Sequence, residues 1–299
     1  MKRPIGAALG LALAILSSAS PAAAQLVENL GGMTAENARK YLAPLPEAFS
    51  GTMNSAIFTT GRVPVTGFTF GIGLKVMGVS LSSQSRLYTP TDPPGFTSVP
   101  PIQQAPTVIG DTQAVAQGGQ GGATTYYPGG FDVSEFAFAA PQLSIGSVLG
   151  TRAVVRWFAY NFGARDVISK VDYFGIGAQH SITQYFTTLP FDLALGGFYQ
   201  RFKVNDDLID SETYHLDLTA SKDFRVLQPY AAIGYDTFTM NVLYEDDTNP
   251  GTNIAVDFDR TSNIHLTAGV VAKLGFAQFH GEANIAATTG VAVGLTFGI

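Results

Sequence analysis

Residues 263–299 alternate apolar and polar side chains almost without interruption. Ile264 and Leu266 are apolar, for example, and His265 between them is polar. A period of two residues is typical of a β-strand with one apolar and one polar face. Long strands of this kind, repeated along an exported chain, predict a transmembrane β-barrel.

The N-terminus carries the features of an export signal. Lys2 and Arg3 form a basic start, residues 5–16 are largely apolar, and three alanines precede Gln25. We therefore expect residues 1–24 to be a signal peptide that is cleaved before Gln25. Together with the barrel pattern, this predicts a location in the bacterial outer membrane.

Charge and composition exclude several classes of protein. Without Lys2 and Arg3, the formal charge is 15 − 23 = −8, so nucleic acid is not an expected partner. The chain has no cysteine, which excludes disulfides and thiolate chemistry. Residues 25–299 contain no apolar stretch of about 18 residues, the length needed for a transmembrane helix. A soluble β-sandwich or a lipocalin-like cup remains the competing fold.

One short helix is expected before the strands. Thr34 can cap a helix over residues 35–42, and Pro44 is expected to end it. The predicted organisation is a signal peptide at 1–24, a helical segment at 25–50 and a barrel at 51–299. The helical segment is expected to lie at the rim or to plug the lumen.

Eleven segments have the pattern of strands. Because single-chain bacterial barrels have even strand numbers, we predict about 12 strands, within a range of 10–14. Either one strand near the N-terminus escapes the pattern, or residues 52–60 do not span. The fold class is therefore all-β, a transmembrane antiparallel up-and-down barrel with a short N-terminal helix. The candidates are residues 52–60, 66–80, 133–145, 152–161, 170–182, 191–204, 212–221, 227–244, 254–274, 276–286 and 290–299.

The connections between these strands alternate in length. Counting back from the C-terminus, the connections at 274–275, 222–225, 146–150 and 61–64 are short, and 182–190 is longer. Four of the five connections expected on the other side are long, polar or rich in Gly and Pro. This alternation is typical of periplasmic turns and extracellular loops. Tyr199 and Tyr214 flank one outer connection on the apolar face, as expected of an aromatic girdle.

The connection at residues 81–132 is the longest in the chain. Prolines and glycines interrupt it throughout, and loops of this length are usually functional or disordered. Two alternatives stay open: a segment that folds over the mouth or into the lumen, and a mobile surface loop.

The last hairpin predicts which side chains face the lumen. With a turn at residues 274–275, Lys273 pairs with Phe276 and Val271 pairs with Gln278, which keeps both polar faces on one side. Similar alternation places polar residues of two further strands inward. The candidate lumen-lining residues are Lys75, His215, Asp217, His265, Lys273, His280, Glu282 and Asn284.

Two possible chemical sites can be read from the sequence, and for each of them a polar lumen without chemistry is the favoured interpretation. His280 and Glu282 share one face, as an acid–base or metal pair would, but barrel interiors are polar in any case. His180 and Ser181 are neighbours on a strand and therefore point to opposite faces, so they make a poor dyad. We expect no catalytic residues, no cofactor and no metal site, and we expect no enzyme.

Several short motifs resemble an uncharacterised family of bacterial outer-membrane proteins. The segment at residues 174–185, FGIGAQHSITQY, is the longest of them. The others are residues 42–45, 140–143, 189–194 and 227–231. The resemblance implies an outer-membrane barrel of unknown function, distantly similar to long-chain fatty-acid transporters.

Three functional hypotheses follow. The first is passive transport or binding of a small molecule, hydrophobic or polar, through a lumen restricted by the long connection. The second is a structural or surface-interaction barrel that acts through its outer loops. The third, and least favoured, is a membrane-embedded lipid enzyme. Membrane lipid and the barrel-assembly machinery are the expected partners, and the sequence does not set the oligomeric state.

Overall fold

The computed structural model describes residues 19–101, 103–161, 170–186, 188–205 and 207–299. Most of the predicted signal peptide, residues 1–18, lies outside these residues. No helix among the described residues is long and apolar enough to cross a bilayer.

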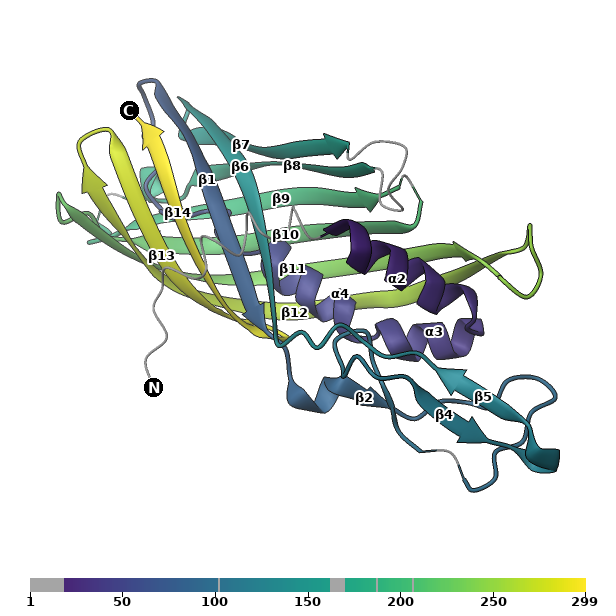
Figure 1. Cartoon of the computed structure of the whole chain (residues 1–299). Coiled ribbons are helices and arrows are strands. Elements are labelled where there is room, and N and C mark those ends of the chain that lie inside the picture. Colours follow the sequence, from purple (N-terminus) through teal and green to yellow (C-terminus); the bar gives the residue numbers. More distant parts are fainter. Residues whose placement is uncertain (1–18, 102, 162–169, 187, 206) are drawn as a thin grey trace.

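Ten antiparallel strands among the described residues form one closed barrel (Figure 1). Strand β1 (Thr69–Ser80) pairs with β14 on one side and with β6 on the other, which closes the sheet. The predicted up-and-down antiparallel barrel is confirmed, with a strand number at the lower limit of the expected range. The other strands are β6 (Glu135–Val148), β7 (Thr151–Asn161), β8 (Lys170–Ser181), β9 (Asp192–Val204), β10 (Ile209–Ser221), β11 (Leu227–Glu245), β12 (Asn253–Leu274), β13 (Ala277–Ile285) and β14 (Thr289–Gly298).

Residues 52–60, one of the eleven candidates, do not form a strand, which confirms the second of the two alternatives for the odd count. The segment lies inside the barrel, where its backbone groups bond to inward side chains instead of to a neighbouring strand. The Ala56 N–H donates to Glu282 Oε1 over 2.7 Å, and the Ile57 carbonyl accepts from Gln142 Nε2 over 3.2 Å. Without this segment the eleven candidates become ten, and the even strand number is restored.

The two ends of the barrel differ. At the end that we call the short-turn end, β6 and β7, β10 and β11, and β12 and β13 are joined by connections of two to five residues. The C-terminus also lies at this end (Figure 1). At the opposite end, which we call the long-loop end, residues 81–134 join β1 to β6, and residues 246–252 join β11 to β12.

The last hairpin has a different register from the predicted one. Lys273 pairs with Gln278 and Val271 with His280, so the turn is Gly275-Phe276. Gly275 adopts a φ of +64°, which suits the first central position of a type II′ turn. The shift moves every pairing by two residues. It leaves the face of every side chain unchanged.

The strands present apolar side chains outward and polar side chains inward. In β10, Leu216 and Leu218 are exposed, whereas Thr213, His215 and Asp217 are buried. Because successive side chains of a strand point to opposite faces, one surface of the sheet is apolar and the other is polar. This is the pattern expected of a membrane-spanning barrel.

Within the described part of the chain, three helices precede β1. They are α2 (Ala19–Gly31), α3 (Ala35–Leu42) and α4 (Pro44–Met53). Thr34 caps α3, as predicted from the sequence. Helix α3 ends at Leu42, before Pro44, as expected, but Pro44 itself begins a further helix, α4, that was not predicted. Proline fits the first turn of a helix because those N–H groups have no intrahelical partner.

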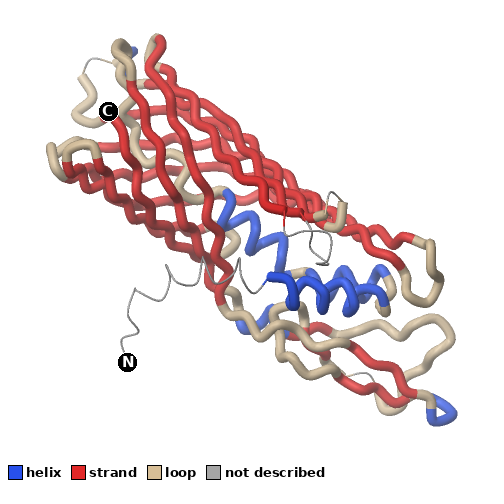
Figure 2. The backbone as a smooth tube through the Cα atoms, turned by 45° about the horizontal axis from the view of Figure 1, so that its top comes forward, coloured by secondary structure: helices blue, strands red, loops and turns tan. Residues whose placement is uncertain are grey.

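Helix α4 fills the long-loop half of the lumen, and α2 and α3 lie at its mouth. Helix α4 contacts β1, β6, β11 and β14, whereas α2 contacts β11 and α3 contacts β12. Figure 2 shows one helix running from the long-loop end into the barrel. Phe49 of α4 packs on Phe136 and Phe202 from the wall, with ring centroids 4.9 and 5.2 Å away. An apolar core therefore occupies this half of the barrel.

The connection at residues 81–134 folds against helix α3. It contains the short strands β2 (Leu87–Tyr88), β3 (Ala105–Pro106), β4 (Val115–Gly118) and β5 (Thr124–Tyr127). Asn37 and Thr91 exchange two hydrogen bonds of 2.8 and 2.9 Å. Burial raises the pKa of Tyr41 to about 12, so its hydroxyl stays protonated and donates to the Gly129 carbonyl. Of the two alternatives, the structure has the segment folded over the mouth.

Candidate functional site in the barrel lumen and wall

All eight predicted lumen-lining residues lie on the inner face of the barrel. Seven of them are buried, and Lys273 is half-buried near the short-turn end. The structure brings them together in three places rather than one. His215, Asp217, His265, Asn284 and Glu282 belong to a connected network, Lys75 and His280 form a pair, and Lys273 stands apart.

Asp236 links the two histidines of the network. His215 Nδ1 lies 2.5 Å from Asp236 Oδ1, and His265 Nδ1 lies 2.7 Å from Asp236 Oδ2. His265 Nε2 lies 2.9 Å from Asn284 Oδ1, and Asn284 Nδ2 donates to Glu282 Oε1 over 2.9 Å. One chain of hydrogen bonds thus runs across β10, β11, β12 and β13.

The sequence prediction missed Asp236. In the sequence, the apolar residues of this segment change from odd to even positions near residues 235–238, and this change hid the inward orientation of Asp236. The structure keeps the even residues of β11 inward throughout. The irregular pairing between β11 and β12 lies at residues 258–261 of β12, where that strand has one more residue than β11. The β-bulge is therefore on β12, and unbroken alternation along β11 would have identified Asp236 as an inward residue.

His280 and Glu282 do not face a common position at which both could bind one ligand. His280 Nδ1 lies 3.1 Å from Lys75 Nζ. Glu282 instead accepts a hydrogen bond of 2.5 Å from Tyr230 and one of 2.7 Å from the Ala56 N–H. Their shared face, which was the basis for an acid–base hypothesis, serves two different contacts.

Lys273 belongs to an ion-pair cluster at the short-turn end. Its Nζ lies 2.6 Å from Asp223 Oδ2, and Arg62 Nη1 lies 2.8 Å from the same oxygen. Hydrogen bonds from Lys273, the Arg225 N–H and Arg62 hold the pKa of Asp223 below its usual value. The cluster fixes the segment that leaves the lumen to the turn between β10 and β11.

Residues 53–62 are bound to the wall along their whole length. Arg156, which is fully buried, donates to the carbonyl oxygens of Met53 and Ser55 over 3.2 and 2.9 Å. Further along, Gln179 donates to the Thr60 carbonyl. Cations favour the C-terminal end of a helix, where carbonyl groups lack partners. Arg156 therefore caps α4 from the barrel wall. Together, helix α4 and the segment to residue 62 form the part of the chain that we call the plug (residues 44–62).

Glycines make room for aromatic side chains beside the plug. Gly175 and Gly177 of β8 lie against the ring of Phe198, and Gly196 of β9 lies against Phe58 of the plug. A Cβ at any of these glycines would collide with the ring that it faces. The wall is thus shaped to receive Phe58.

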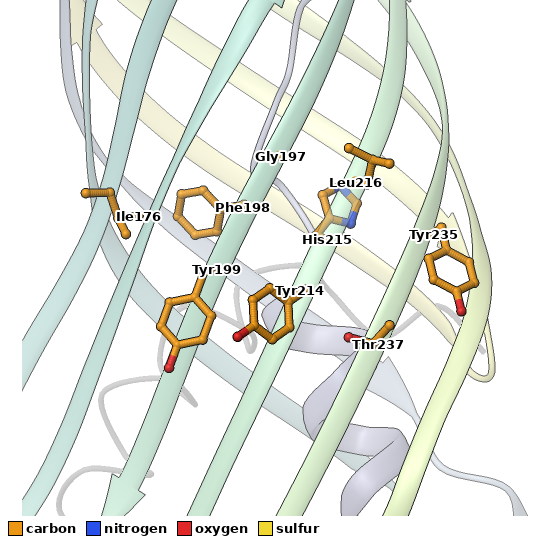
Figure 3. A pocket seen from close by; sticks show the side chains of 9 residues that line it. All are labelled: Ile176, Gly197, Phe198, Tyr199, Tyr214, His215, Leu216, Tyr235 and Thr237. Carbon is orange, nitrogen blue, oxygen red and sulfur yellow. The ribbon is translucent and has the colours of Figure 1, made fainter.

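A mostly apolar groove of about 480 Å³ lies on the outer side of this wall. Figure 3 shows the side chains that border it, from strands β8 to β11. Tyr199 and Tyr214, the pair expected in an aromatic girdle, lie side by side with ring centroids 5.0 Å apart. The groove also reaches the inward-pointing Phe198 and His215, next to Gly197. The wall is therefore thin where Gly197 has no side chain.

The chain has low similarity to solved structures of bacterial barrel proteins. It is 14% identical to the toluene transporter TbuX of Ralstonia pickettii over 91% of this chain and 98% of that one, with a TM-score of 0.31. It is 16% identical to the N-terminal β-barrel domain of OprF of Pseudomonas aeruginosa over 50% and 98%, with a TM-score of 0.27. A porin of Rh. blastica is 12% identical over 78% and 100%, with a TM-score of 0.17.

The fold assignment rests on the closed strand order rather than on these likenesses. A search of curated proteins gives no significant match. A family model, in contrast, matches the whole sequence, residues 1–299, which agrees with the resemblance of its motifs to an uncharacterised family. The chain belongs to the family of unknown function DUF6588.

Proposed function

We propose that this protein is an outer-membrane barrel that binds a small hydrophobic molecule and passes it across the membrane. The observation that carries the proposal is the groove at Gly197. It opens on the lipid-facing side, it is lined mainly by apolar and aromatic side chains, and it reaches side chains that belong to the lumen. Pockets with this lining are typical of binding sites for small apolar ligands.

The filled lumen supports a hydrophobic cargo over a polar one. The apolar core at the long-loop end and the plug occupy the space that a water-filled channel would need. A polar solute has no wet route through the described residues of this half, whereas an apolar molecule can partition from lipid into the groove. We also propose the distant similarity to long-chain fatty-acid transporters that the sequence motifs imply. We propose no catalytic role.

A pair of glycine substitutions tests the proposal. Gly197 and Gly281 both lie on the outer face of their strands. A Cβ atom added at either position would have no neighbouring atom closer than 3.9 Å. Gly197→Leu fills the groove, whereas Gly281→Leu adds the same side chain to the wall elsewhere. We expect Gly197→Leu to abolish protein-dependent uptake of naphthalene into liposomes and Gly281→Leu to leave it unchanged. Equal uptake by both variants and the unmodified chain would refute the groove as the binding site.

A second function is favoured by the folded connection at the long-loop end. Residues 81–134 form a lobe that projects beyond the barrel and packs on α3 (Figure 1). Such a lobe suits a barrel that binds a partner at the cell surface. Deletion of residues 92–104 would then abolish partner binding and preserve naphthalene uptake, which separates this function from the first.

A further inference from the structure

Two histidines and one aspartate lie together in the lumen, on three neighbouring strands. His215 comes from β10, Asp236 from β11 and His265 from β12. One donor atom from each residue lies within 4.8 Å of the others, and all three side chains are buried. Two imidazoles and a carboxylate are the donor set that divalent zinc and its neighbours prefer.

Hydrogen bonds fix the protonation of His265. Its Nδ1 faces the carboxylate of Asp236, which can only accept, so Nδ1 carries a proton. Asn284 donates its amide nitrogen to the Glu282 carboxylate, so its oxygen is the atom that faces His265 Nε2. His265 Nε2 must therefore also carry a proton. This hydrogen-bond pattern therefore assigns a proton to both nitrogens of His265, one of them between two potential metal ligands.

The outer nitrogens of both histidines face acceptor oxygens. His265 Nε2 lies 2.9 Å from Asn284 Oδ1, and His215 Nε2 lies 3.9 Å from Asp217 Oδ2. Metal-bound histidines almost always donate their second N–H to a carboxylate or a carbonyl oxygen. The cluster therefore contains both the ligands and the groups that orient them.

Asp217 provides an independent indication. Its carboxylate is buried, and its Oδ1 atom has no hydrogen-bond partner among the described residues. Buried polar atoms without partners are costly and rare. A proton held on His215 Nε2 would direct a donor at Oδ2, the other oxygen of this carboxylate, which lies 3.9 Å away. That tautomer is the one a metal bound at His215 Nδ1 requires.

We propose that His215, Asp236 and His265 bind one divalent transition-metal ion of the zinc type inside the barrel. The ion would be bound by both Nδ1 atoms and one Asp236 oxygen, with a water molecule in the remaining position. Ligands of zinc lie about 3.4 Å from each other in a tetrahedral site, so the donor atoms must separate by roughly 1 Å from their hydrogen-bonded distances. The proposal differs from the expectation from sequence that the chain holds no metal.

The exchange balances charge and protons. The ion displaces the Nδ1 proton of His265, which is released to solvent. On His215 the Nδ1 proton is either released or replaced by one on Nε2. If both imidazoles begin protonated, two positive charges leave and two arrive, so the net charge of the buried cluster is unchanged. Low-dielectric surroundings favour such an exchange over the addition of uncompensated charge.

Cobalt binding to the full chain tests the site. The protein is folded from denaturant into detergent micelles with Co²⁺ present, so that access to the lumen is not limiting, and excess metal is removed by gel filtration. We expect one Co²⁺ per chain, the visible absorption of a tetrahedral Co²⁺ site, and release of at least one proton per ion in an unbuffered titration. Zn²⁺ should displace the cobalt and remove the absorption.

Four variants make the test specific. His215→Gln and Asp236→Asn each remove one ligand and should abolish the absorption, whereas His280→Gln removes a buried lumen histidine outside the cluster and should retain it. Asp217→Asn should weaken affinity by about 10- to 100-fold without removing a ligand, as loss of an orienting group does. Heat-modifiable migration on gels shows that each barrel is folded.

Absence of stoichiometric Co²⁺ from the folded, unmodified chain would overturn the proposal. So would equal binding by the unmodified chain and folded His215→Gln. Either result would mean that the cluster is held together by hydrogen bonds and binds no metal ion. The result does not depend on the proposed transport, because naphthalene uptake is measured separately and can fail while the metal binds.

Discussion

Arg156 makes three buried hydrogen bonds, two to the plug and one within the barrel wall. Two reach the carbonyl oxygens of Met53 and Ser55, and the third, from Nε, reaches Gln142 Oε1 over 2.7 Å. Arg156→Met keeps much of the side-chain volume but leaves these acceptors without a buried donor. We expect a loss of about 3 kcal/mol in the free energy of unfolding, measured by urea titration in detergent.

Arg201→Met is the matched control for Arg156→Met. Arg201 also lies on a strand and pairs with Asp210 over 2.5 Å, but its side chain is 42% exposed. Exposed ion pairs contribute less than about 1 kcal/mol. Equal destabilisation by the two substitutions would contradict the role that we give to Arg156.

Asp223 gives the barrel a pH-dependent contact at the short-turn end. Because Lys273, the Arg225 N–H and Arg62 hold its pKa below the unfolded value of about 4, it stabilises the fold above that pH. The contribution is lost as the pH falls through the folded pKa. We expect Asp223→Asn to lower the thermal midpoint at pH 7 and to have less effect at pH 3. A difference that stays constant between pH 3 and pH 7 would show that the charge of Asp223 is not involved.

At the residue scale, the orientation of most side chains could be predicted from the sequence. Alternation alone placed His215, His265 and Glu282 on the inner face, because successive side chains of a strand must oppose each other. It could not show that Asp236 joins the two histidines, since the contact depends on the register between three strands. Arg156 was missed because Val154 and Val155 interrupt the alternation before it.

At the element scale, the turn between β10 and β11 contains a strained residue. Arg225 is exposed and has a φ of +70°, a conformation that favours glycine. Arg225→Gly removes the steric cost and keeps the backbone N–H that donates to Asp223. We expect a gain of about 1 kcal/mol in the free energy of unfolding from urea titration. A loss of stability would show that the side chain of Arg225 contributes more than the backbone strain costs.

The contact between helix α3 and the long connection can be tested on its own. Asn37→Ala removes both hydrogen bonds to Thr91, so residues 87–92 should lose protection in amide hydrogen exchange while the barrel strands keep theirs. Gln84→Ala, at an exposed position of the same connection, should change nothing. Unchanged protection of residues 87–92 in Asn37→Ala would mean that other contacts hold the lobe.

Helices and strands could be predicted from the sequence where contacts between residues close together in the chain determine them. The cap at Thr34 placed α3 correctly, because the capping contact is made within one turn. Helix α4 was missed because Pro44, Pro46 and Gly51 lower its intrinsic propensity, and its burial by the barrel provides the compensation. The register of the last hairpin was wrong by two residues because a shift of two preserves every face.

At the scale of the whole molecule, the closed antiparallel barrel and its short and long connections followed from periodicity, whereas the ten strands are fewer than the 12 predicted. The path of residues 44–62 through the lumen did not follow from periodicity. It depends on contacts with strands that are 226 residues away along the chain in one case, the hydrogen bond from the Ala56 N–H to Glu282, and no local pattern encodes such contacts. The same holds for the groove at Gly197, which combines outward residues of four strands.

Ion conductance across planar bilayers tests the central claim, that the chain closes its own barrel. The full-length protein is compared with a variant that lacks residues 25–60, both shown to be folded by heat-modifiable migration. We predict no steady conductance for the full chain and a steady open channel for the variant, because the plug fills the lumen and α2 and α3 lie at its mouth. Steady conductance of the full chain, equal to that of the variant, would contradict the account.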